Sequence, residues 1–443
     1  MTAAGIEHLA IVAGGKGSRM GGAFEGLPKA LIPIGGKPVL QHQLELAAGA
    51  GVREVSVFAG HLADRIAEFV GDGSRFGLKV RLLVEAEPLG NAGGVLAALD
   101  ELPEQLFVIY GDVMAAVDLK AMGAFHLERG ADFTTLAHPN DHPADSDLLE
   151  VDPDDGVTAV RPCPHPPGEW FCNLVNAALY AVRRDALRIL PAGGAADFSK
   201  DVMPHLIGAG AKVLAWRSSD YIKDMGAPGR LERVEADFRA GRIRLPAPGR
   251  GRKAVFLDRD GTVNVERPFL SRAEDFELLP GVGDALRRLR QAGYRLVLVT
   301  NQPVIARGEA SEADVARIHR RLEWELGEAG AFLDAIYLCP HHPEAGFPGE
   351  RSELKVACDC RKPATGLVER ACRELGIDAA SSWMVGDQTR DIEMARRAGL
   401  RSVLVRTGLA GGDGAFECRP DAEAADIAEA AELIAQSHSV AAA

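Results

Sequence analysis

The sequence has no long apolar run of the kind that crosses a membrane. A spanning helix needs roughly 18 or more consecutive apolar residues, and no such run occurs in the 443 residues. The opening stretch, MTAAGIEHLAIVAGG, also lacks the basic start and the apolar segment of a secretory signal peptide. We therefore expect a cytoplasmic protein with no membrane partner.

Positive charge is in deficit. The chain carries 50 Lys and Arg against 63 Asp and Glu, which gives a net charge of −13. A general nucleic-acid surface needs a basic footprint, so we expect no nucleic-acid partner. Nucleotides need only a few local cations and backbone N–H groups, and small molecules remain the expected partners. Nothing in the sequence indicates the oligomeric state.

Cysteine is scarce, with seven residues in the whole chain. An odd number argues against a complete disulfide framework, and three of the seven fall between positions 339 and 360. Both features favour metal ligation in a reducing compartment.

Apolar strand-like runs alternate with helical patterns along most of the chain. This alternation predicts an α/β architecture with parallel sheets. Residues 241–252, GRIRLPAPGRGR, combine Gly, Pro and Arg without apolar periodicity, which predicts a linker. We therefore expect two α/β domains, 1–240 and 253–443. The strand-like runs are HLAIVAG (8–14), EVSVFAG (54–60), QLFVIYGD (105–112), KAVFLDRD (253–260), YRLVLVTN (294–301) and SWMVGD (382–387).

A glycine-rich turn, GGKGSR over 14–19, follows the first strand-like run. Gly14, Gly15 and Gly17 would let the backbone approach an anion, because successive N–H groups can form a phosphate-binding concavity. Arg19 and Lys29 add cations nearby. Taken alone, the turn is equally compatible with a tight connection between strand and helix.

Three further motifs point the same way. EPLGNAGG over 87–94 supplies a second glycine loop with Gly90, Asn91 and Gly93. Asp112 ends an apolar run, where open α/β sheets bind ligands, and Asp224 lies in the later turn DMGAP. Two carboxylates beside a polyphosphate site predict a shared Mg²⁺, which prefers oxygen ligands.

With these motifs in order, residues 6–240 resemble the sugar-1-phosphate nucleotidyltransferases, whose signature carries G-G-x-G-[ST]-R followed by P-K. The resemblance implies a Rossmann-like mixed sheet and attack of a sugar 1-phosphate oxygen on the α-phosphorus of a nucleotide, with release of pyrophosphate. Two departures from the family pattern are Ala178 in N-x-G-x-Y and Ala227 in D-[IM]-G-T-P. The roles implied are triphosphate binding by Gly14, Gly15, Gly17 and Arg19, neutralisation of the attacked phosphate by Lys29, base and ribose contacts by Gly90, Asn91 and Gly93, and Mg²⁺ binding by Asp112 and Asp224.

The second half opens with VFLDRDGT, an apolar strand that ends in Asp258 and Asp260. Residues i and i+2 of an extended chain point to the same side, so one carboxylate can act as nucleophile and the other as acid and base. A lone D-x-D could also be a metal site or a solvated turn. Three further polar residues follow in order along the chain. They are Thr300 at the end of a strand-like run, Lys362 just before a predicted helix, and Asp387 in the sequence GDQTRD.

This order resembles the haloacid dehalogenase superfamily, and it implies a parallel sheet. By that resemblance Asp258 attacks phosphorus to form an aspartyl-phosphate, and Asp260 protonates the leaving oxygen and then activates water. Thr300 and Lys362 would hold the phosphoryl oxygens. Mg²⁺ would be bound by Asp258, the backbone carbonyl of Asp260 and Asp387, with Asp391 in support.

Cys339, His341, Cys358 and Cys360 form C-x-H…C-x-C, the donor set of a closed tetrahedral Zn²⁺ site. We expect a structural zinc loop in the second domain. His342 is an alternative to His341 as the imidazole ligand.

A zinc loop reading CPHHP…CDCRKP resembles the D-glycero-D-manno-heptose 1,7-bisphosphate phosphatases, in which Asn301, Arg361 and Lys362 match substrate-contacting positions. Departures from that family are Pro303-Val304 in the loop after Thr300 and Gln388 where lysine is frequent. Together the halves imply a bifunctional enzyme of nucleotide-activated heptose synthesis that transfers GMP from GTP.

Three alternatives remain open. They are another nucleotide and sugar pair, a histidinol-phosphate phosphatase in the second half, and a regulatory nucleotide-sugar sensor with an inactive transferase half.

Overall fold

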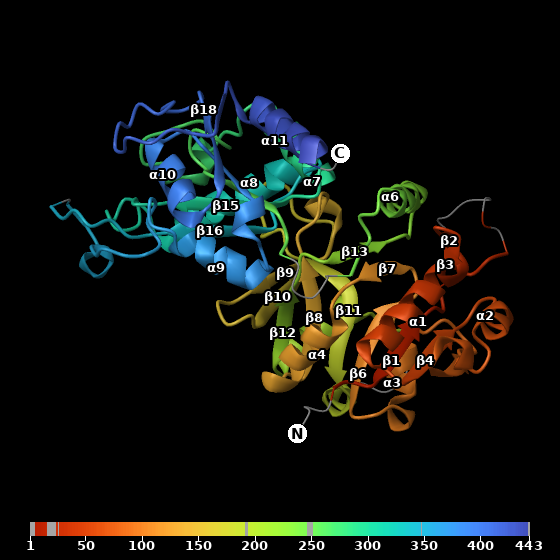
Figure 1. Ribbon diagram of the computed structural model, residues 1–443. Coiled ribbons are helices and arrows are strands. Elements are labelled where there is room, and N and C mark those ends of the chain that lie inside the picture. Colours follow the sequence, from red (N-terminus) through yellow and green to blue (C-terminus); the bar gives the residue numbers. More distant parts are fainter. Residues whose placement is uncertain are drawn as a thin grey trace. The chain divides into compact units, whose positions relative to one another are not determined.

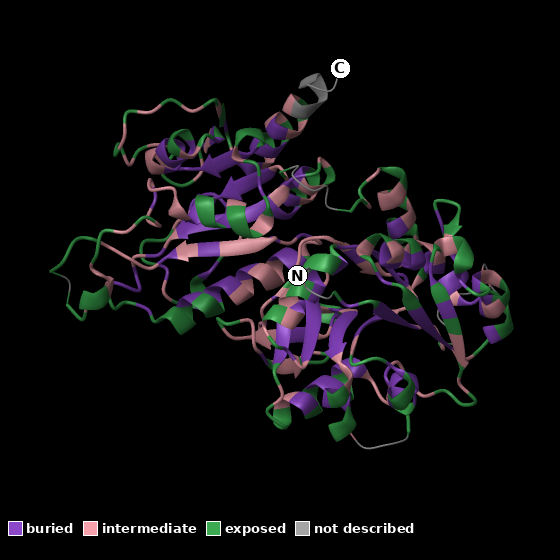
Figure 2. Cartoon of the chain, turned by 60° about the horizontal axis from the view of Figure 1, so that its bottom comes forward, coloured by how far each residue is buried: buried purple, intermediate pink, exposed green. Residues whose placement is uncertain are grey.

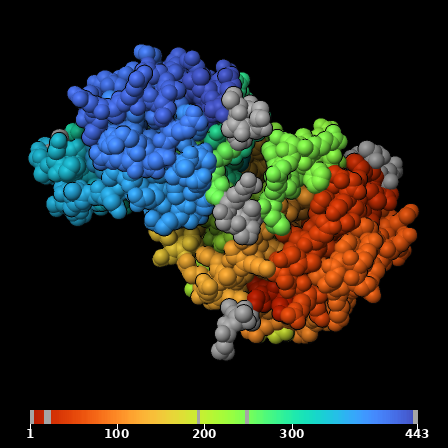
Figure 3. All heavy atoms as spheres, viewed as in Figure 1, coloured from red at the N-terminus to blue at the C-terminus, as the bar shows by residue number. Residues whose placement is uncertain are grey.

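The computed structural model describes residues 5–15, 24, 26–190, 194–245, 251–346 and 348–441. By its internal contacts the chain divides into two compact units. The first unit comprises Met1–His138, Ser146–Cys163 and Leu174–Pro248; the second comprises Pro139–Asp145, Pro164–Asn173 and Gly249–Ala443. The blue and cyan atoms of the second unit form one continuous body in Figure 3.

The first unit is built on a mixed nine-stranded sheet, counted over the described residues. Its main path runs β10-β9-β11-β6-β1-β4-β5, and β8 pairs with both β11 and β12. The central strands β1, β4, β5 and β6 are parallel, whereas β11 runs antiparallel to β6. The nine strands are β1 (His8–Val12), β4 (Glu54–Ala59), β5 (Lys79–Val84), β6 (Gln105–Tyr110), β8 (Phe133–His138), β9 (Leu148–Val151), β10 (Val157–Arg161), β11 (Val175–Arg183) and β12 (Val213–Arg217).

Two short antiparallel pairs complete this unit, β2 (Pro33–Ile34) with β3 (Lys37–Pro38) and β7 (Val113–Ala116) with β13 (Tyr221–Asp224). The β7–β13 pair matters for the site, because it brings a turn near residue 226 beside the end of β6. The helices are α1 (Val39–Ala50), α2 (Ala63–Val70), α3 (Gly93–Ala97), α4 (Leu119–Glu128), α5 (Met203–Gly208) and α6 (Pro228–Arg239), many of them labelled in Figure 1.

The second unit contains a six-stranded sheet in the order β16-β15-β14-β17-β18-β19, and every pairing in it is parallel. Parallel strands need helical crossovers, and the helical patterns between the strand-like runs supply them. The strands are β14 (Ala254–Leu257), β15 (Arg295–Asn301), β16 (Ala335–Cys339), β17 (Trp383–Gly386), β18 (Arg401–Val405) and β19 (Ala422–Ala424); the helices are α7 (Val282–Gln291), α8 (Glu312–Glu328), α9 (Gly366–Leu375), α10 (Thr389–Ala398) and α11 (Ile427–Ala441).

Helix α8 shows how the sequence produces these crossovers. Ser311 caps it by accepting a hydrogen bond from Asp314 N at 3.1 Å, while the Asp314 carboxylate accepts one from Ser311 N at 2.9 Å. Buried Val315, Ile318 and Leu322 recur at helical spacing and pack one face of the helix toward the core. Figure 2 shows the same division, with strands mostly purple and helices banded in purple and green.

The predicted α/β fold class, with a mixed sheet in the first half and a parallel sheet in the second, is confirmed. In the second unit β14 lies between β15 and β17, so the carboxyl ends of these three strands meet at one edge. The motifs D-x-D, T-N and G-D all lie at that edge.

Candidate functional sites

In the first unit, three predicted charged residues converge on Gly226. A methyl group on Gly226 would lie 3.2 Å from Asp224 Oδ1, 3.8 Å from Asp112 Oδ2 and 3.8 Å from Lys29 Nζ. Lys29 Nζ also pairs with Asp112 Oδ2 at 3.2 Å. Asp112 follows β6 and Asp224 ends β13, so strand pairing brings two distant carboxylates together. They are oxygen donors of the kind that Mg²⁺ prefers, and glycine at position 226 places no side chain in the space next to them.

Arg230 is a member of this cluster that the motifs did not indicate. It lies in the first turn of α6, and its Nη1 donates to Asp224 Oδ1 at 2.8 Å and to Oδ2 at 2.7 Å. A single arginine in a turn gives no distinctive sequence signal, because its partner is fixed only when α6 packs beside β13.

The first glycine loop is described in part. Gly14 and Gly15 follow β1, whereas Gly17 and Arg19 lie outside the described residues. A methyl group on Gly14 would lie 2.8 Å from Glu85 Oε2 and one on Gly94 would lie 2.1 Å from Glu85 Oε1. Glu85 therefore sits between the two glycine loops, and burial raises the pKa of its carboxyl group.

The second glycine loop is held against residues 194–198. Gly90 has φ of 74°, and a side chain there would collide with Ala196 O at 2.4 Å. The Asn91 amide donates to Asp197 Oδ2 at 2.6 Å and accepts from Phe198 N at 2.8 Å. A methyl group on Gly93 would likewise lie 2.8 Å from Gly194 O. These residues thus shape the loop through contacts within the unit.

The departure at Ala178 has a structural consequence. Ala178 has φ of 55°, the left-handed region that favours glycine. The register of β11 against β8 shifts between Asn176 and Tyr180, so Ala178 lies in a β-bulge. Next to it, Asn176 Nδ2 donates to Tyr180 Oη at 3.0 Å and to Ser199 Oγ at 3.1 Å.

In the second unit, the predicted carboxylates and lysine meet at the sheet edge. Lys362 Nζ lies 2.6 Å from Asp258 Oδ1 and 2.7 Å from Asp391 Oδ1, and all three side chains are buried. Burial and the neighbouring Asp391 carboxylate raise the pKa of Asp258 well above its ordinary value. The lysine therefore holds the Asp258 side chain in place, but its single positive charge does not balance both the Asp258 and the Asp391 carboxylates.

Asp387 completes this carboxylate cluster. One ligand atom each from Asp258, Asp387 and Asp391 lie within 4.8 Å of one another. Asp387 Oδ2 accepts from Leu409 N at 2.8 Å, while Oδ1 is buried and has no hydrogen-bond partner among the described residues. Burial raises the pKa of Asp387 to about 7. Three buried carboxylates face one lysine, and a divalent cation would supply the missing charge.

The glycines around Asp387 keep this space open. Gly261 has φ of 77° and Gly408 has φ of 61°, and a methyl group on either would lie within 2.4 Å of Asp387 Oδ2. The glycine of the D-x-D-G motif is therefore required both for its backbone conformation and for access to the carboxylate.

Asp260 is oriented by its neighbours. Arg259 Nη2 donates to Asp260 Oδ2 at 2.9 Å, Gln302 Nε2 to the same oxygen at 2.9 Å, and Asn264 Nδ2 to Oδ1 at 3.0 Å. Burial alone would raise the pKa of Asp260, but Arg259 and these hydrogen bonds leave it below the ordinary value. Thr300 Oγ1, at the end of β15, accepts from Gln302 Nε2 at 2.8 Å.

The predicted substrate-contacting residues lie beside the lysine. Asn301 Oδ1 accepts from Lys362 N at 3.0 Å, and Asn301 Nδ2 donates to Lys362 O at 3.2 Å. Arg361 Nη1 donates to His341 O at 3.2 Å, which connects the arginine to the cysteine loop. Asn301 thus fixes the backbone that presents Lys362.

The two departures in this unit are both accommodated. Gln388 is the N-cap of α10, where it forms a capping box with Asp391. Pro303 begins a turn in which Arg307 N donates to Pro303 O at 2.9 Å, and Val304 is buried in a small apolar cluster. The missing N–H of Pro303 therefore costs no strand hydrogen bond.

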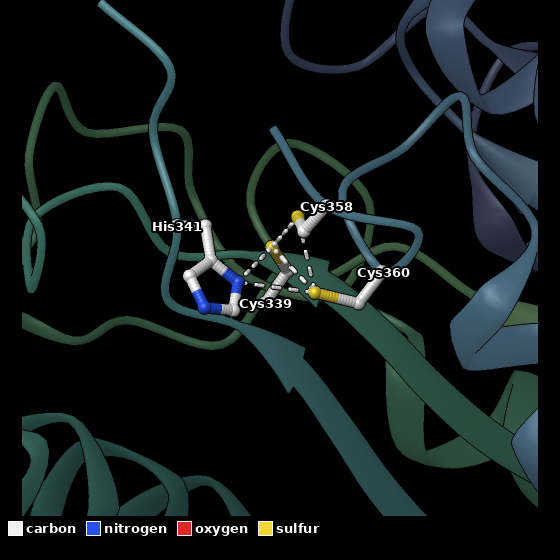
Figure 4. A group of neighbouring side chains, drawn as sticks. All are labelled: Cys339, His341, Cys358 and Cys360. Carbon is white, nitrogen blue, oxygen red and sulfur yellow. Dashed lines mark hydrogen bonds between the residues drawn. The ribbon is translucent and has the colours of Figure 1, made fainter. Parts of the chain in front are cut away.

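The cysteine loop brings its four predicted donors together, and Figure 4 shows the side chains of Cys339, His341, Cys358 and Cys360 pointing toward one another. Their ligand atoms lie within 4.8 Å of each other. His341 Nδ1 is 3.3 Å from Cys360 Sγ, and Cys339 Sγ is 3.6 Å from Cys358 Sγ. His342 Nδ1 instead lies 3.3 Å from the Glu344 carbonyl oxygen. Three thiols and one imidazole are a donor set that suits Zn²⁺.

Comparison with known proteins finds a different family in each half of the chain. Residues 9–240 match the nucleotidyl transferase family, and residues 359–430 match the HAD-hydrolase-like family. The solved structure of HddC from Yersinia pseudotuberculosis has a TM-score of 0.46 at 23% identity, covering 53% of this chain and 100% of that one.

Two curated relatives have a higher sequence identity to this chain than that structure has. The D-glycero-β-D-manno-heptose-1,7-bisphosphate 7-phosphatase of Haemophilus ducreyi is 48% identical over 162 residues, 36% of this chain and 86% of the relative. The enzyme of the same name from Escherichia coli strain K12 is 45% identical over 156 residues, 35% of this chain and 80% of the relative. The chain belongs to the nucleotidyl transferase family and to the family of these phosphatases.

The chain is therefore a bifunctional enzyme that combines nucleotidyl transferase and phosphatase activities. No helix in the described residues is long and apolar enough to cross a membrane.

Proposed function

We propose that this enzyme catalyses two consecutive steps in the synthesis of a nucleotide-activated heptose. The second unit would remove the 7-phosphate of D-glycero-D-manno-heptose 1,7-bisphosphate, and the first unit would transfer GMP from GTP to the remaining 1-phosphate. The evidence for the first step is the sequence identity with the bisphosphate phosphatases, which extends over most of their length. The evidence for the second step is the presence of both families in one chain, because a nucleotidyl transferase consumes the sugar 1-phosphate that the phosphatase produces.

In the phosphatase reaction, an Asp258 oxygen attacks the 7-phosphorus and the bond from phosphorus to the sugar oxygen breaks. A proton passes from Asp260 to that oxygen, which leaves as the alcohol. Asp260 then takes a proton from water, whose oxygen attacks phosphorus and restores the Asp258 carboxylate as phosphate departs. Thr300 and Lys362 hold the phosphoryl oxygens, while Asn301 and Arg361 contact the sugar.

In the transferase reaction, a 1-phosphate oxygen of the heptose attacks the α-phosphorus of GTP and pyrophosphate leaves. Lys29 lies 3.2 Å from Asp112, and this position supports a role for its ammonium group in neutralising the phosphate under attack. Gly14, Gly15, Gly17 and Arg19 would bind the triphosphate, and Gly90, Asn91 and Gly93 would lie along the base and ribose.

Phosphatases of this type use Mg²⁺, and the unpartnered Asp387 oxygen supports such a site here. Asp258, the backbone carbonyl of Asp260 and Asp387 would hold one ion, and Asp112 and Asp224 a second in the transferase site. Bound Mg²⁺ supplies positive charge to phosphoryl oxygens. Zn²⁺ held by Cys339, His341, Cys358 and Cys360 would be structural, because four protein donors leave no open position.

The decisive experiment separates the two activities. Asp258→Asn should reduce phosphate release from the bisphosphate below detection, because an amide cannot form the aspartyl-phosphate. Pyrophosphate release from GTP and heptose 1-phosphate should stay within about twofold of wild type, since the variant residue lies in the other unit. Parallel assays with ATP, CTP and UTP test the base, and loss of both activities at unchanged stability would contradict the two-site proposal.

A further inference from the structure

The residue between the two aspartates of D-x-D has an unusual environment. Arg259 is 0% exposed and is one of the largest fully buried side chains among the described residues. A guanidinium group is always charged, and burying it is costly unless several acceptors surround it. Its position next to Asp258 and Asp260 therefore calls for an explanation beyond packing.

The Arg259 guanidinium group donates hydrogen bonds to both oxygens of the Asp260 carboxylate. Arg259 Nε lies 3.1 Å and Nη2 3.0 Å from Asp260 Oδ1, and Nη2 lies 2.9 Å from Oδ2. Planar contacts of this kind fix the rotation of a carboxylate, which a single point charge such as an ammonium group cannot do. The Asp260 side chain remains 21% exposed.

Two further residues hold the arginine itself. Gln302 Oε1 accepts from Arg259 Nη2 at 2.9 Å, while the Gln302 amide nitrogen donates to Asp260 Oδ2 and Thr300 Oγ1. On the other side, Arg259 Nη1 lies 3.2 Å from Nε2 of His319, which is buried on α8. Because arginine only donates, this ring nitrogen is the acceptor, and the imidazole is neutral.

We propose that Arg259 is a positioning residue that fixes the Asp260 carboxyl group for proton transfer to the leaving oxygen, with His319 and Gln302 holding Arg259 in place. The inference rests on the proposed phosphatase chemistry. Proton transfer needs the donor within hydrogen-bond reach and correctly oriented, so freedom of rotation at Asp260 slows the step that needs its proton. Because Arg259 is 0% exposed, it acts through Asp260 and does not itself contact the phosphoryl group.

The test compares two leaving groups in the full-length protein. Arg259→Lys keeps the charge and removes the planar contact. We expect kcat/KM for the heptose bisphosphate to fall about 100-fold, the scale of general acid catalysis. For p-nitrophenyl phosphate, whose phenolate leaves without a proton, kcat/KM should fall less than about fivefold, because this parameter reports only steps up to the aspartyl-phosphate. Inhibition by inorganic phosphate should be unchanged.

Matched variants give the control and the rescue. Arg288→Lys makes the same exchange at an exposed position on α7 and should leave both substrates unaffected. His319→Gln retains an acceptor for Arg259 and should keep most of the activity, whereas His319→Leu should reproduce the leaving-group selectivity of Arg259→Lys.

Equal losses on both substrates, or equal effects of His319→Gln and His319→Leu, would show that the network is merely structural and overturn the proposal. Failure of the phosphatase chemistry itself would appear differently, as p-nitrophenyl phosphate hydrolysis that survives Asp258→Asn.

Discussion

At the scale of single residues, Ala178 carries a measurable conformational cost. A non-glycine residue in the left-handed region costs roughly 1–2 kcal/mol, and glycine removes most of this penalty while losing one methyl contact and some chain entropy. Ala178 has φ of 55° in the β11 bulge and is partly buried. We expect Ala178→Gly to stabilise the first unit by about 1 kcal/mol, measured by chemical denaturation.

The neighbouring alanine provides the control. Ala177 lies in the same strand without a positive φ, so Ala177→Gly should destabilise the unit by about 0.5–1 kcal/mol. If both substitutions shifted stability in the same direction, the backbone argument at Ala178 would be wrong.

Residues that belong to short linear motifs could be predicted from the sequence, and residues that join through tertiary packing could not. Asp258, Lys362 and Asp387 each follow a recognisable strand or precede a helix, so their meeting at one sheet edge follows from the parallel topology. From the sequence, His319 is predicted only to lie on the buried face of a helix. Its contact with Arg259 depends on how α8 packs against the strand that precedes Arg259.

At the scale of elements, the cysteine loop between β16 and α9 is the segment most dependent on a ligand. The described residues of 340–361 are exposed or half-buried, and the regular structure among them is the short 3₁₀ turn at Ser352–Leu354, so few apolar contacts order this loop. We expect close to one Zn²⁺ per chain by elemental analysis, and expect Cys358→Ser combined with Cys360→Ser to remove it. The same double variant should make the loop sensitive to protease.

Cysteines outside the cluster give a matched comparison. Cys372 lies on α9, and the Cys418 thiol donates to Thr389 O at 3.2 Å. The double variant Cys372→Ser with Cys418→Ser should therefore retain full zinc. Zinc that persisted in the Cys358 and Cys360 variant would refute the ligand assignment.

The sequence indicated the alternation of strands and helices, because apolar periodicity is local. It did not indicate the bulge in β11 or the pairing of β7 with β13, which place Asn176 and Asp224. Both depend on contacts between segments distant in sequence, and short strands of four residues carry little periodic signal.

At the scale of the whole molecule, the second unit is not one continuous piece of chain. Residues 139–145 and 164–173 precede the 241–252 segment in sequence yet belong to this unit. Trp170 packs against its apolar core, with the Arg321 guanidinium 5.3 Å from the ring centre. Asn173 N donates to Glu323 Oε2 at 3.1 Å, and the His165 and Trp324 rings meet edge to face at 5.7 Å. Residues 139–145 and 164–173 contain no sequence motif that would predict their place in the second unit.

This arrangement predicts that one tryptophan from the N-terminal half of the sequence stabilises the phosphatase. Trp170→Ala removes a partly buried aromatic side chain and should destabilise the second unit by about 2 kcal/mol, somewhat less than for a fully buried ring. Trp216 offers the mirror-image control, since it is partly buried against the core of the first unit. After graded heating of the full-length protein, Trp170→Ala should lower the midpoint for loss of phosphate release and leave that for pyrophosphate release in place, whereas Trp216→Ala should do the reverse. If Trp170→Ala shifted only the transferase midpoint, residues 164–173 would contribute to the first unit and the division of the chain would need to be redrawn.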